Sequence, residues 1–184
     1  MKDLIAFTGT KGSGKDTAGS AFTDRGYRNV KFADALKCMI HVLLMYRGAT
    51  ADYAYRCIEG DLKEVPCPLL EGKTPRYAMQ KLGTEWGRDL IGEGLWVNSF
   101  KDKVNDPNDN RPVVCTDCRF PNEVDTIREL GGHLVRINRA GQVIDDLHES
   151  ERHIPTLDVH ADISNHAESA EAFKAQIAKL FFTH

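Results

Sequence analysis

A glycine-rich stretch near the amino end has the residue types and the spacing that bind phosphate. It follows the apolar run 4–7, precedes a segment of helical periodicity, and reads Gly9-Thr10-Lys11-Gly12-Ser13-Gly14-Lys15-Asp16-Thr17. Glycines let the backbone turn tightly, so successive N–H groups can point at phosphate oxygens, and the helix that follows adds its positive end. Lys15 stands where it can reach the β- and γ-phosphates of a nucleotide. The stretch therefore predicts a phosphate-binding loop, with a plain glycine-rich turn as the alternative.

Asp16 stands where the common phosphate-loop pattern has Ser or Thr to bind magnesium. A carboxylate beside a triphosphate is repelled unless a cation lies between them, and Mg²⁺ prefers oxygen ligands. We therefore expect Asp16 to help hold Mg²⁺, directly or through water. The alternative is that Asp16 merely caps the helix, because Asp is common at that position.

The segment 75–90 carries a second group of chemically capable residues on a predicted helix. One face of that helix is apolar, and another carries Arg76, Gln80, Gly83 and Thr84. Arg grips phosphate with a planar fork, Gln can read the edge of a base, and a glycine lets another group pack closely on the backbone. This face either binds a phosphorylated ligand or is a solvated surface with an incidental glycine.

Two charged residues, Asp117 and Arg119, follow a buried-type strand expected over 113–116. Because ligands of open α/β sheets bind at the carboxyl ends of strands, we expect both to face a bound anion and its metal. Trp96 begins an expected helix over 95–104 and either stacks on a base or fills the core. Judged from its type alone, the core is the better expectation.

Composition limits the class of protein. The chain has 184 residues, a length typical of a single domain, with a net charge of −3 and a pI near 6.2. That charge argues against a surface for a nucleic-acid polymer. There is no apolar run of the ~20 residues needed to cross a membrane and no signal-peptide pattern. We expect a cytoplasmic enzyme that contacts neither membrane nor nucleic acid.

The five cysteines include a pair with C-x-x-C spacing, Cys115 and Cys118. This spacing occurs in zinc and redox sites. No second pair with ligand spacing follows, and the pair ends an apolar strand instead of starting a helix. Reduced, structural thiols are therefore the expectation.

Apolar periodicity predicts alternating strands and helices. Strands are expected over 3–8, 30–32, 113–116, 133–138 and 161–164, and helices over 15–25, 33–46, 51–58, 75–90, 95–104, 121–130 and 167–182. This alternation predicts an α/β fold with a parallel central sheet and helices on both faces. The helical stretch 33–110 is the natural place for an acceptor-binding region. The polar segment 139–156 is either a lid or an exposed charged loop.

A phosphate-binding loop alone does not distinguish hydrolysis, switching and phosphoryl transfer, so other features of the sequence must do so. The chain lacks the Asn-Lys-x-Asp segment that reads guanine in GTPases, and its length leaves little room for the further domains of a motor or transport ATPase. Phosphoryl transfer to a small phosphorylated acceptor fits the candidate residues of this chain, because a phosphate acceptor is already an anionic nucleophile. Such transfer needs positioning and charge neutralisation instead of a dedicated base.

Taken together, several motifs resemble the deoxynucleoside monophosphate kinases of tailed bacteriophages. These are Gly-Ser-Gly-Lys-Asp-Thr at 12–17, Lys-Phe-Ala-Asp-Ala-Leu-Lys at 31–37, the series Arg76, Gln80, Gly83, Thr84 and Trp96, Asp-Cys-Arg-Phe-Pro-Asn-Glu at 117–123, and His-Glu-Ser-Glu at 148–151. The resemblance runs from the first expected strand to the last. It implies a P-loop kinase fold that moves the γ-phosphate of ATP onto a deoxynucleoside monophosphate (dNMP), usually as a homodimer, in the infected cell.

The resemblance also assigns roles to residues. It implies that ATP is bound by Lys11, Gly12, Ser13, Gly14, Lys15, Asp16, Thr17 and Arg139, and that Asp16 and Thr17 hold Mg²⁺. It implies that the dNMP is bound by Asp34, Lys37, Arg76, Gln80, Gly83, Thr84, Arg88, Trp96, Asp117, Arg119 and Glu123. Lys15, Asp16 and Arg119 are the implied catalytic residues. Where the family can have a lysine after the helix arginine, this chain has Tyr77.

Two alternatives compete with this reading. A kinase of another small phosphate, of the phosphomevalonate or dephospho-coenzyme A type, can carry a related loop. A nucleotide-binding regulator that transfers nothing can carry one too. Gln80 and Trp96 favour a nucleotide acceptor over the first alternative.

Overall fold

The computed structural model describes residues 3–139 and 152–182 of the chain. It separates into two compact units, one formed by Met1–Phe32 with Phe100–His184 and the other by Ala33–Ser99. We call them the sheet unit and the helical unit. The expected lid segment 139–156 lies mostly outside the described residues, which resume before a short 3₁₀ turn, η4 (Ile154–Thr156).

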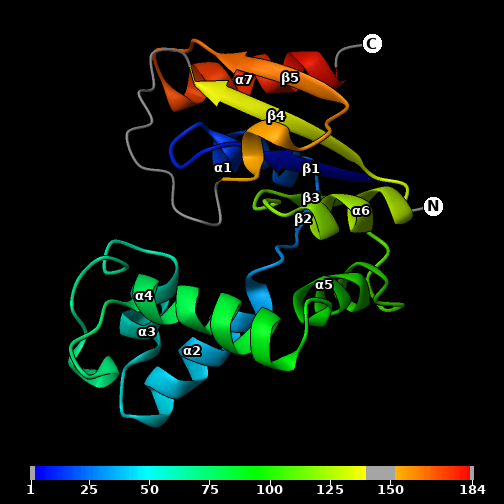
Figure 1. Ribbon diagram of the computed structural model, residues 1–184. Coiled ribbons are helices and arrows are strands. Elements are labelled where there is room, and N and C mark those ends of the chain that lie inside the picture. Colours follow the sequence, from blue (N-terminus) through cyan, green and yellow to red (C-terminus); the bar gives the residue numbers. More distant parts are fainter. Residues whose placement is uncertain (1–2, 140–151, 183–184) are drawn as a thin grey trace. The chain divides into compact units, whose positions relative to one another are not determined.

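The sheet unit is built on five parallel strands. They are β1 (Leu4–Thr8), β2 (Arg28–Asn29), β3 (Val113–Cys115), β4 (His133–Arg139) and β5 (Ala161–Asn165). Their order across the sheet is β2-β3-β1-β4-β5, so β1 is central and its carboxyl end lies between those of β3 and β4 (Figure 1). The parallel sheet predicted from the alternation of elements is confirmed.

The second strand differs from the prediction, which placed it at 30–32. β2 ends at Asn29, although the Val30 N–H still donates to the Val114 carbonyl at 3.0 Å. The Phe32 N–H donates to the Asp117 carboxylate at 3.0 Å and not to a neighbouring strand. A partner 85 residues away in the chain therefore ends the strand early.

Helices cover both faces of the sheet, as predicted. On one face, α1 (Lys15–Thr23) and α7 (Ala170–Phe182) pack against alternate residues of the strands. This core contains Ile5, Phe7, Phe22, Val114, Val135, Ile137, Phe173 and Ile177. On the other face lies α6 (Pro121–Glu129), and Gly132 just after it packs so closely that a Cβ there would lie 2.6 Å from the Leu4 side chain. Burial of both faces explains why β1 and β3 are almost wholly apolar, whereas β2 and β5 at the two edges carry polar residues.

The helical unit contains α2 (Asp34–Tyr46), α3 (Ala51–Ile58), the 3₁₀ turn η1 (Pro68–Leu70), α4 (Pro75–Lys81) and the π-helix η2 (Leu82–Ile91). Thr50 and Thr74 cap α3 and α4 by accepting the N–H of the residue three positions on. The unit has its own core, formed by Ile40, Leu44, Ala54, Cys57, Ile58 and Cys67.

The predicted helix over 75–90 is thus two helices, α-helical and then π-helical, and Trp96 lies against the second. Its indole N–H donates to the Gly83 carbonyl at 2.7 Å, and a Cβ on Gly87 would lie 2.4 Å from its ring. Trp96 is buried, so the expectation of a core residue is confirmed. Gly87, which sequence reasoning did not single out, is where the close approach occurs.

Helix α5 (Leu95–Val104) begins in the helical unit, and from Phe100 onward it belongs to the sheet unit. The helical unit therefore ends before the expected limit of 110. Phe100 stacks on Phe32 with ring centroids 4.1 Å apart, and the Arg28 guanidinium donates to the last carbonyls of α5 at 2.7 and 2.6 Å. No helix among the described residues is long and apolar enough to cross a membrane.

Candidate nucleotide-binding site

The glycine loop lies at the carboxyl end of β1, where it turns into α1. Gly9 has φ of 147°, and a Cβ there would lie 2.4 Å from the Ile137 carbonyl oxygen. Gly14 has φ of 108°, and a Cβ there would lie 2.8 Å from the Asn165 side chain. Only glycine fits these two positions, which keeps the loop pressed against the ends of the strands.

Lys15 is folded over the loop. Its ammonium donates to the Thr10 carbonyl at 2.7 Å, and the side chain is buried. The Ser13 hydroxyl is also buried and has no hydrogen-bond partner among the described residues. The buried hydroxyl and the buried ammonium lie in one turn, and an anion with several oxygens can accept hydrogen bonds from both.

A cavity of about 300 Å³ opens beside the loop, within the sheet unit. Its lining includes the start of α1, the end of β4 and the segment that leads into α7: Gly12, Gly14, Lys15, Asp16, Thr17, Arg139, Asn165, Ala167, Glu168, Ser169, Ala170 and Phe173. Part of the loop, Arg139 and the first turn of α1 thus line the same cavity. The residues from Asn165 to Phe173 were missed.

Two strand ends hold the loop from the cavity side. The Arg139 guanidinium donates to the Gly12 carbonyl at 3.2 Å. The Asn165 amide donates to the Ser13 carbonyl at 3.0 Å, while its oxygen accepts the Ala167 N–H at 3.1 Å. Asn165 ends the last strand of a parallel sheet, so the rule that ligands bind at strand carboxyl ends was the signal that could have found it.

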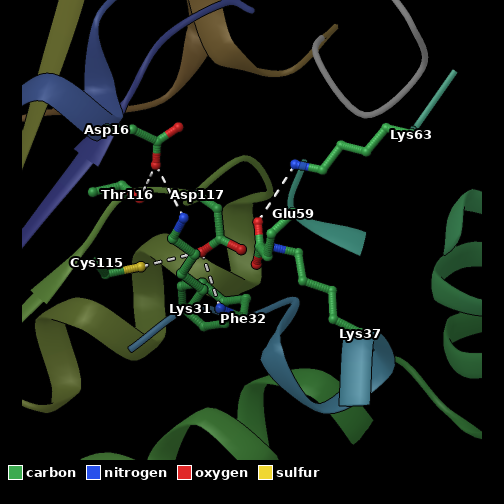
Figure 2. A network of polar contacts seen from close by, with 9 residues as sticks. All are labelled: Asp16, Lys31, Phe32, Lys37, Glu59, Lys63, Cys115, Thr116 and Asp117. Carbon is green, nitrogen blue, oxygen red and sulfur yellow. Dashed lines mark hydrogen bonds and ion pairs between the residues drawn. The ribbon is translucent and has the colours of Figure 1, made fainter. Parts of the chain in front are cut away.

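Asp16 projects from the first turn of α1 toward the ends of neighbouring strands. One carboxylate oxygen accepts from the Lys31 ammonium at 3.0 Å and from the Thr116 hydroxyl at 2.7 Å (Figure 2). Desolvation opposes ionisation, but the Lys31 charge and the Thr116 hydrogen bond outweigh it and lower the pKa of Asp16. The N-cap of α1 is Gly14, so Asp16 is not the capping residue. An ionised carboxylate oxygen is a ligand that Mg²⁺ prefers.

The carboxylates of Asp117 and Glu123 accept hydrogen bonds from backbone N–H groups in this structure. Asp117 accepts the Phe32 N–H at 3.0 Å and the Cys115 thiol at 3.3 Å (Figure 2). Glu123 is buried and accepts the N–H groups of Arg119 at 2.7 Å and of Phe120 at 3.2 Å, which caps α6. The position of Arg119 is therefore set by Glu123.

Four of the five cysteines are buried, and Cys38 is exposed. All five are free thiols, and Cys115 and Cys118 are buried at the end of β3 and just beyond it. Burial raises the pKa of both thiols well above the usual value, and the neighbouring carboxylates act in the same direction. Neither is a reactive thiolate.

Most of the residues that the resemblance assigned to the acceptor lie in the helical unit. Asp34 and Lys37 are on α2, Arg76 and Gln80 on α4, and Gly83, Thr84 and Arg88 on η2. The Lys37 ammonium pairs with Glu59 at 2.6 Å, and the Arg76 guanidinium pairs with Glu64 at 2.5 Å. Trp96 is on α5, also within the helical unit, and the remaining three, Asp117, Arg119 and Glu123, belong to the sheet unit.

Comparison with known proteins identifies the family of the chain. The family "Deoxynucleotide monophosphate kinase" matches residues 50–177. A "Putative deoxynucleotide monophosphate kinase" of Acanthamoeba polyphaga mimivirus is 34% identical over 185 residues, covering 95% of this chain and 93% of the viral protein. The "Deoxynucleoside-5'-monophosphate kinase" of Escherichia phage T5 is 31% identical over 113 residues, 56% of this chain and 44% of that one.

Among solved structures, TT1252 from Thermus thermophilus matches with a TM-score of 0.50 and 15% identity, and the match covers 100% of this chain and 99% of that one. At that identity the likeness concerns the fold alone. The glycine loop on a parallel sheet, the family match and the viral relative that covers nearly the whole chain lead to one conclusion. The chain belongs to the deoxynucleotide monophosphate kinase family, and it has the P-loop kinase fold.

Proposed function

We propose that the cavity beside the glycine loop holds ATP and that the helical unit binds the deoxynucleoside monophosphate that receives its γ-phosphoryl group. Membership of the family makes the chain a kinase with ATP as donor and a deoxynucleotide as acceptor. The observation that carries the donor site is the cavity of about 300 Å³ lined by the loop, Lys15 and Asp16.

In the donor site, the backbone N–H groups of the loop and the Lys15 ammonium would neutralise phosphate oxygens. The bond from Lys15 to the Thr10 carbonyl shows that its ammonium already lies over the loop. Arg139 and Asn165 keep the loop in shape through its carbonyls. The part of the cavity lined by residues 167–170 and Phe173 would take the nucleoside of ATP, because it forms the wall of the cavity outside the glycine loop.

Asp16 and Thr17 would hold Mg²⁺ in this site. Lys31 and Thr116 support that role, since they keep the Asp16 carboxylate ionised at the end of β3. When bound, the ion neutralises charge on the transferring phosphoryl group. Together with Lys15 and Arg119 it would leave little need for a catalytic base, because the acceptor phosphate is already anionic.

In the acceptor site, we assign phosphate binding to Lys37 and Arg76 and base recognition to Gln80. Support comes from α4, which presents Arg76 and Gln80 one turn apart. Trp96 is buried with its indole N–H on the Gly83 carbonyl. It would therefore act by holding the η2 backbone in place instead of stacking on the base.

We also propose that the enzyme is a homodimer that works in the cytoplasm of an infected cell. The viral origin of the two relatives supports the second point. Exposed apolar side chains on α2, among them Val42 and Tyr46, support the first. Sedimentation equilibrium checks the assembly state, and a monomer at micromolar concentration would contradict it.

ADP formation tests the function. The chain is assayed with ATP and Mg²⁺ against the four common dNMPs, their ribonucleotide counterparts, phosphomevalonate and dephospho-coenzyme A. We expect ADP formation that depends on a dNMP. Lys15→Met should reduce turnover about 10²-fold or more, because it removes a preorganised charge from the phosphates, while circular dichroism stays unchanged. Activity with only a non-nucleotide acceptor, or no acceptor-dependent ADP, would refute the proposal.

A further inference from the structure

Glu59 in the helical unit holds two lysines at once. Lys37 on α2 places its ammonium 2.6 Å from one carboxylate oxygen, and Lys63, in the segment after α3, places its own 3.4 Å from the other (Figure 2). The exposed fractions of the side chains are 15% for Lys37, 24% for Lys63 and 25% for Glu59, so the group is half-buried. No role was assigned to Lys63 from the sequence.

Lys63 is also tied to the arginine of α4. The Arg76 N–H donates to the Lys63 carbonyl at 2.9 Å, and the Arg76 guanidinium pairs with Glu64 at 2.5 Å. The set formed by Lys37, Lys63 and Arg76 with Glu59 and Glu64 therefore carries three positive and two negative charges. Three segments of the helical unit bring these charges together: α2, the segment after α3, and α4.

The surroundings of Lys63 favour an additional anion. Burial lowers the pKa of Lys63, Glu59 opposes that change, and the positive charges of Lys37 and Arg76 add to it. An ammonium in such a place is stabilised by a further negative charge. Each lysine has three N–H donors, of which the bond to Glu59 uses one. A phosphate, like a carboxylate, presents neighbouring oxygens that two ammonium groups can share.

We propose that Lys63 is a third cation of the acceptor site, which binds the phosphate of the deoxynucleoside monophosphate together with Lys37 and Arg76. Glu59 is a positioning residue that holds the two lysine side chains side by side. This inference rests on the proposed function of the helical unit and names the part of the substrate that the cluster recognises.

The test compares a nucleotide with its nucleoside. Calorimetry gives the dissociation constants of the dNMP that the wild-type enzyme phosphorylates fastest and of the matching deoxynucleoside. Lys63→Met should weaken dNMP binding about tenfold, the lower end for one charge-assisted hydrogen bond at a half-buried site, and leave nucleoside binding unchanged. The KM for the dNMP should rise while the KM for ATP stays constant. Lys63→Arg should restore most of the affinity.

Lys81→Met is the matched control, because Lys81 pairs with Glu85 in an exposed i,i+4 pair of the same unit. It should change none of these constants. An equal loss for nucleotide and nucleoside, or no loss for either, would overturn the inference and leave Lys63 a structural residue. If Lys63→Met fails to fold by circular dichroism, Lys63→Gln, which can still donate to Glu59, provides the same comparison.

The outcome also separates this inference from the proposed function. A wild-type enzyme that forms ADP with a dNMP while the Lys63 variants keep wild-type affinity contradicts the role of Lys63 alone. A wild-type enzyme with no dNMP-dependent ADP formation contradicts both.

Discussion

Replacement of Asn165 tests whether the end of β5 shapes the ATP site. Asn165 is buried, lines the cavity, and donates its amide to the Ser13 carbonyl at 3.0 Å. Asn165→Asp keeps the shape of the side chain but replaces that donor with a negative oxygen. Asn165→Ala removes the donor without adding charge. The two variants therefore separate the hydrogen bond from the electrostatics.

The expected magnitudes follow from these contacts. Both variants leave a buried carbonyl without its donor, which lowers the free energy of unfolding by about 1–3 kcal/mol. The new carboxylate also repels bound ATP. At a separation of ~8 Å and an effective dielectric constant of 20, one phosphate charge is destabilised by about 2 kcal/mol. That corresponds to a rise of about 30-fold in the KM for ATP, since 1.4 kcal/mol is tenfold.

A coupled assay of ADP formation measures the KM for ATP and for the dNMP, and urea unfolding measures stability. We expect Asn165→Asp to raise the KM for ATP about 30-fold and to leave the KM for the dNMP within about twofold. Asn138→Asp is the control, because Asn138 on β4 donates to Asp162 at 2.9 Å on the exposed surface, where solvent and salt screen the charge. Equal KM values for ATP in the two aspartate variants would refute the reasoning.

Two further changes probe the other contacts. Gly87→Ala should lower the free energy of unfolding in urea by about 1–3 kcal/mol, because its Cβ would lie 2.4 Å from the packed ring of Trp96; an unchanged midpoint would mean that the indole can move aside. Thr116→Val removes the 2.7 Å hydrogen bond to the Asp16 carboxylate. It should raise the Mg²⁺ concentration for half-maximal activity several-fold without changing the KM for the dNMP, whereas an unchanged titration would separate Thr116 from metal binding.

Local signals account for the elements that were predicted well. The helix over 51–58 and the helix over 95–104 have the bounds expected from periodicity, and the loop at 9–14 lies between β1 and α1 as its glycines require. Helix propensity, end capping and glycine conformation act over a few residues, so a linear chain displays them. The resemblance to the family rests largely on the same kind of signal, because most of its motifs are short and contiguous.

The parts that were missed or misplaced depend on partners far away in the chain. β2 ends early because Asp117 takes the Phe32 N–H, and the helix after 81 becomes π-helical where Trp96 lies on its backbone. Asn165 reaches the loop across 152 positions in the chain.

The order of residues alone thus determined the glycine loop, the parallel α/β sheet and the likeness to the family, because glycine spacing, alternating apolar runs and short motifs are local properties. Only the tertiary structure decided which side chains share the site. It paired Asp16 with Lys31 and Thr116, placed Asn165 on the loop, and put Lys37 and Lys63 on one carboxylate. Such contacts depend on where separate elements pack, and no local pattern encodes that.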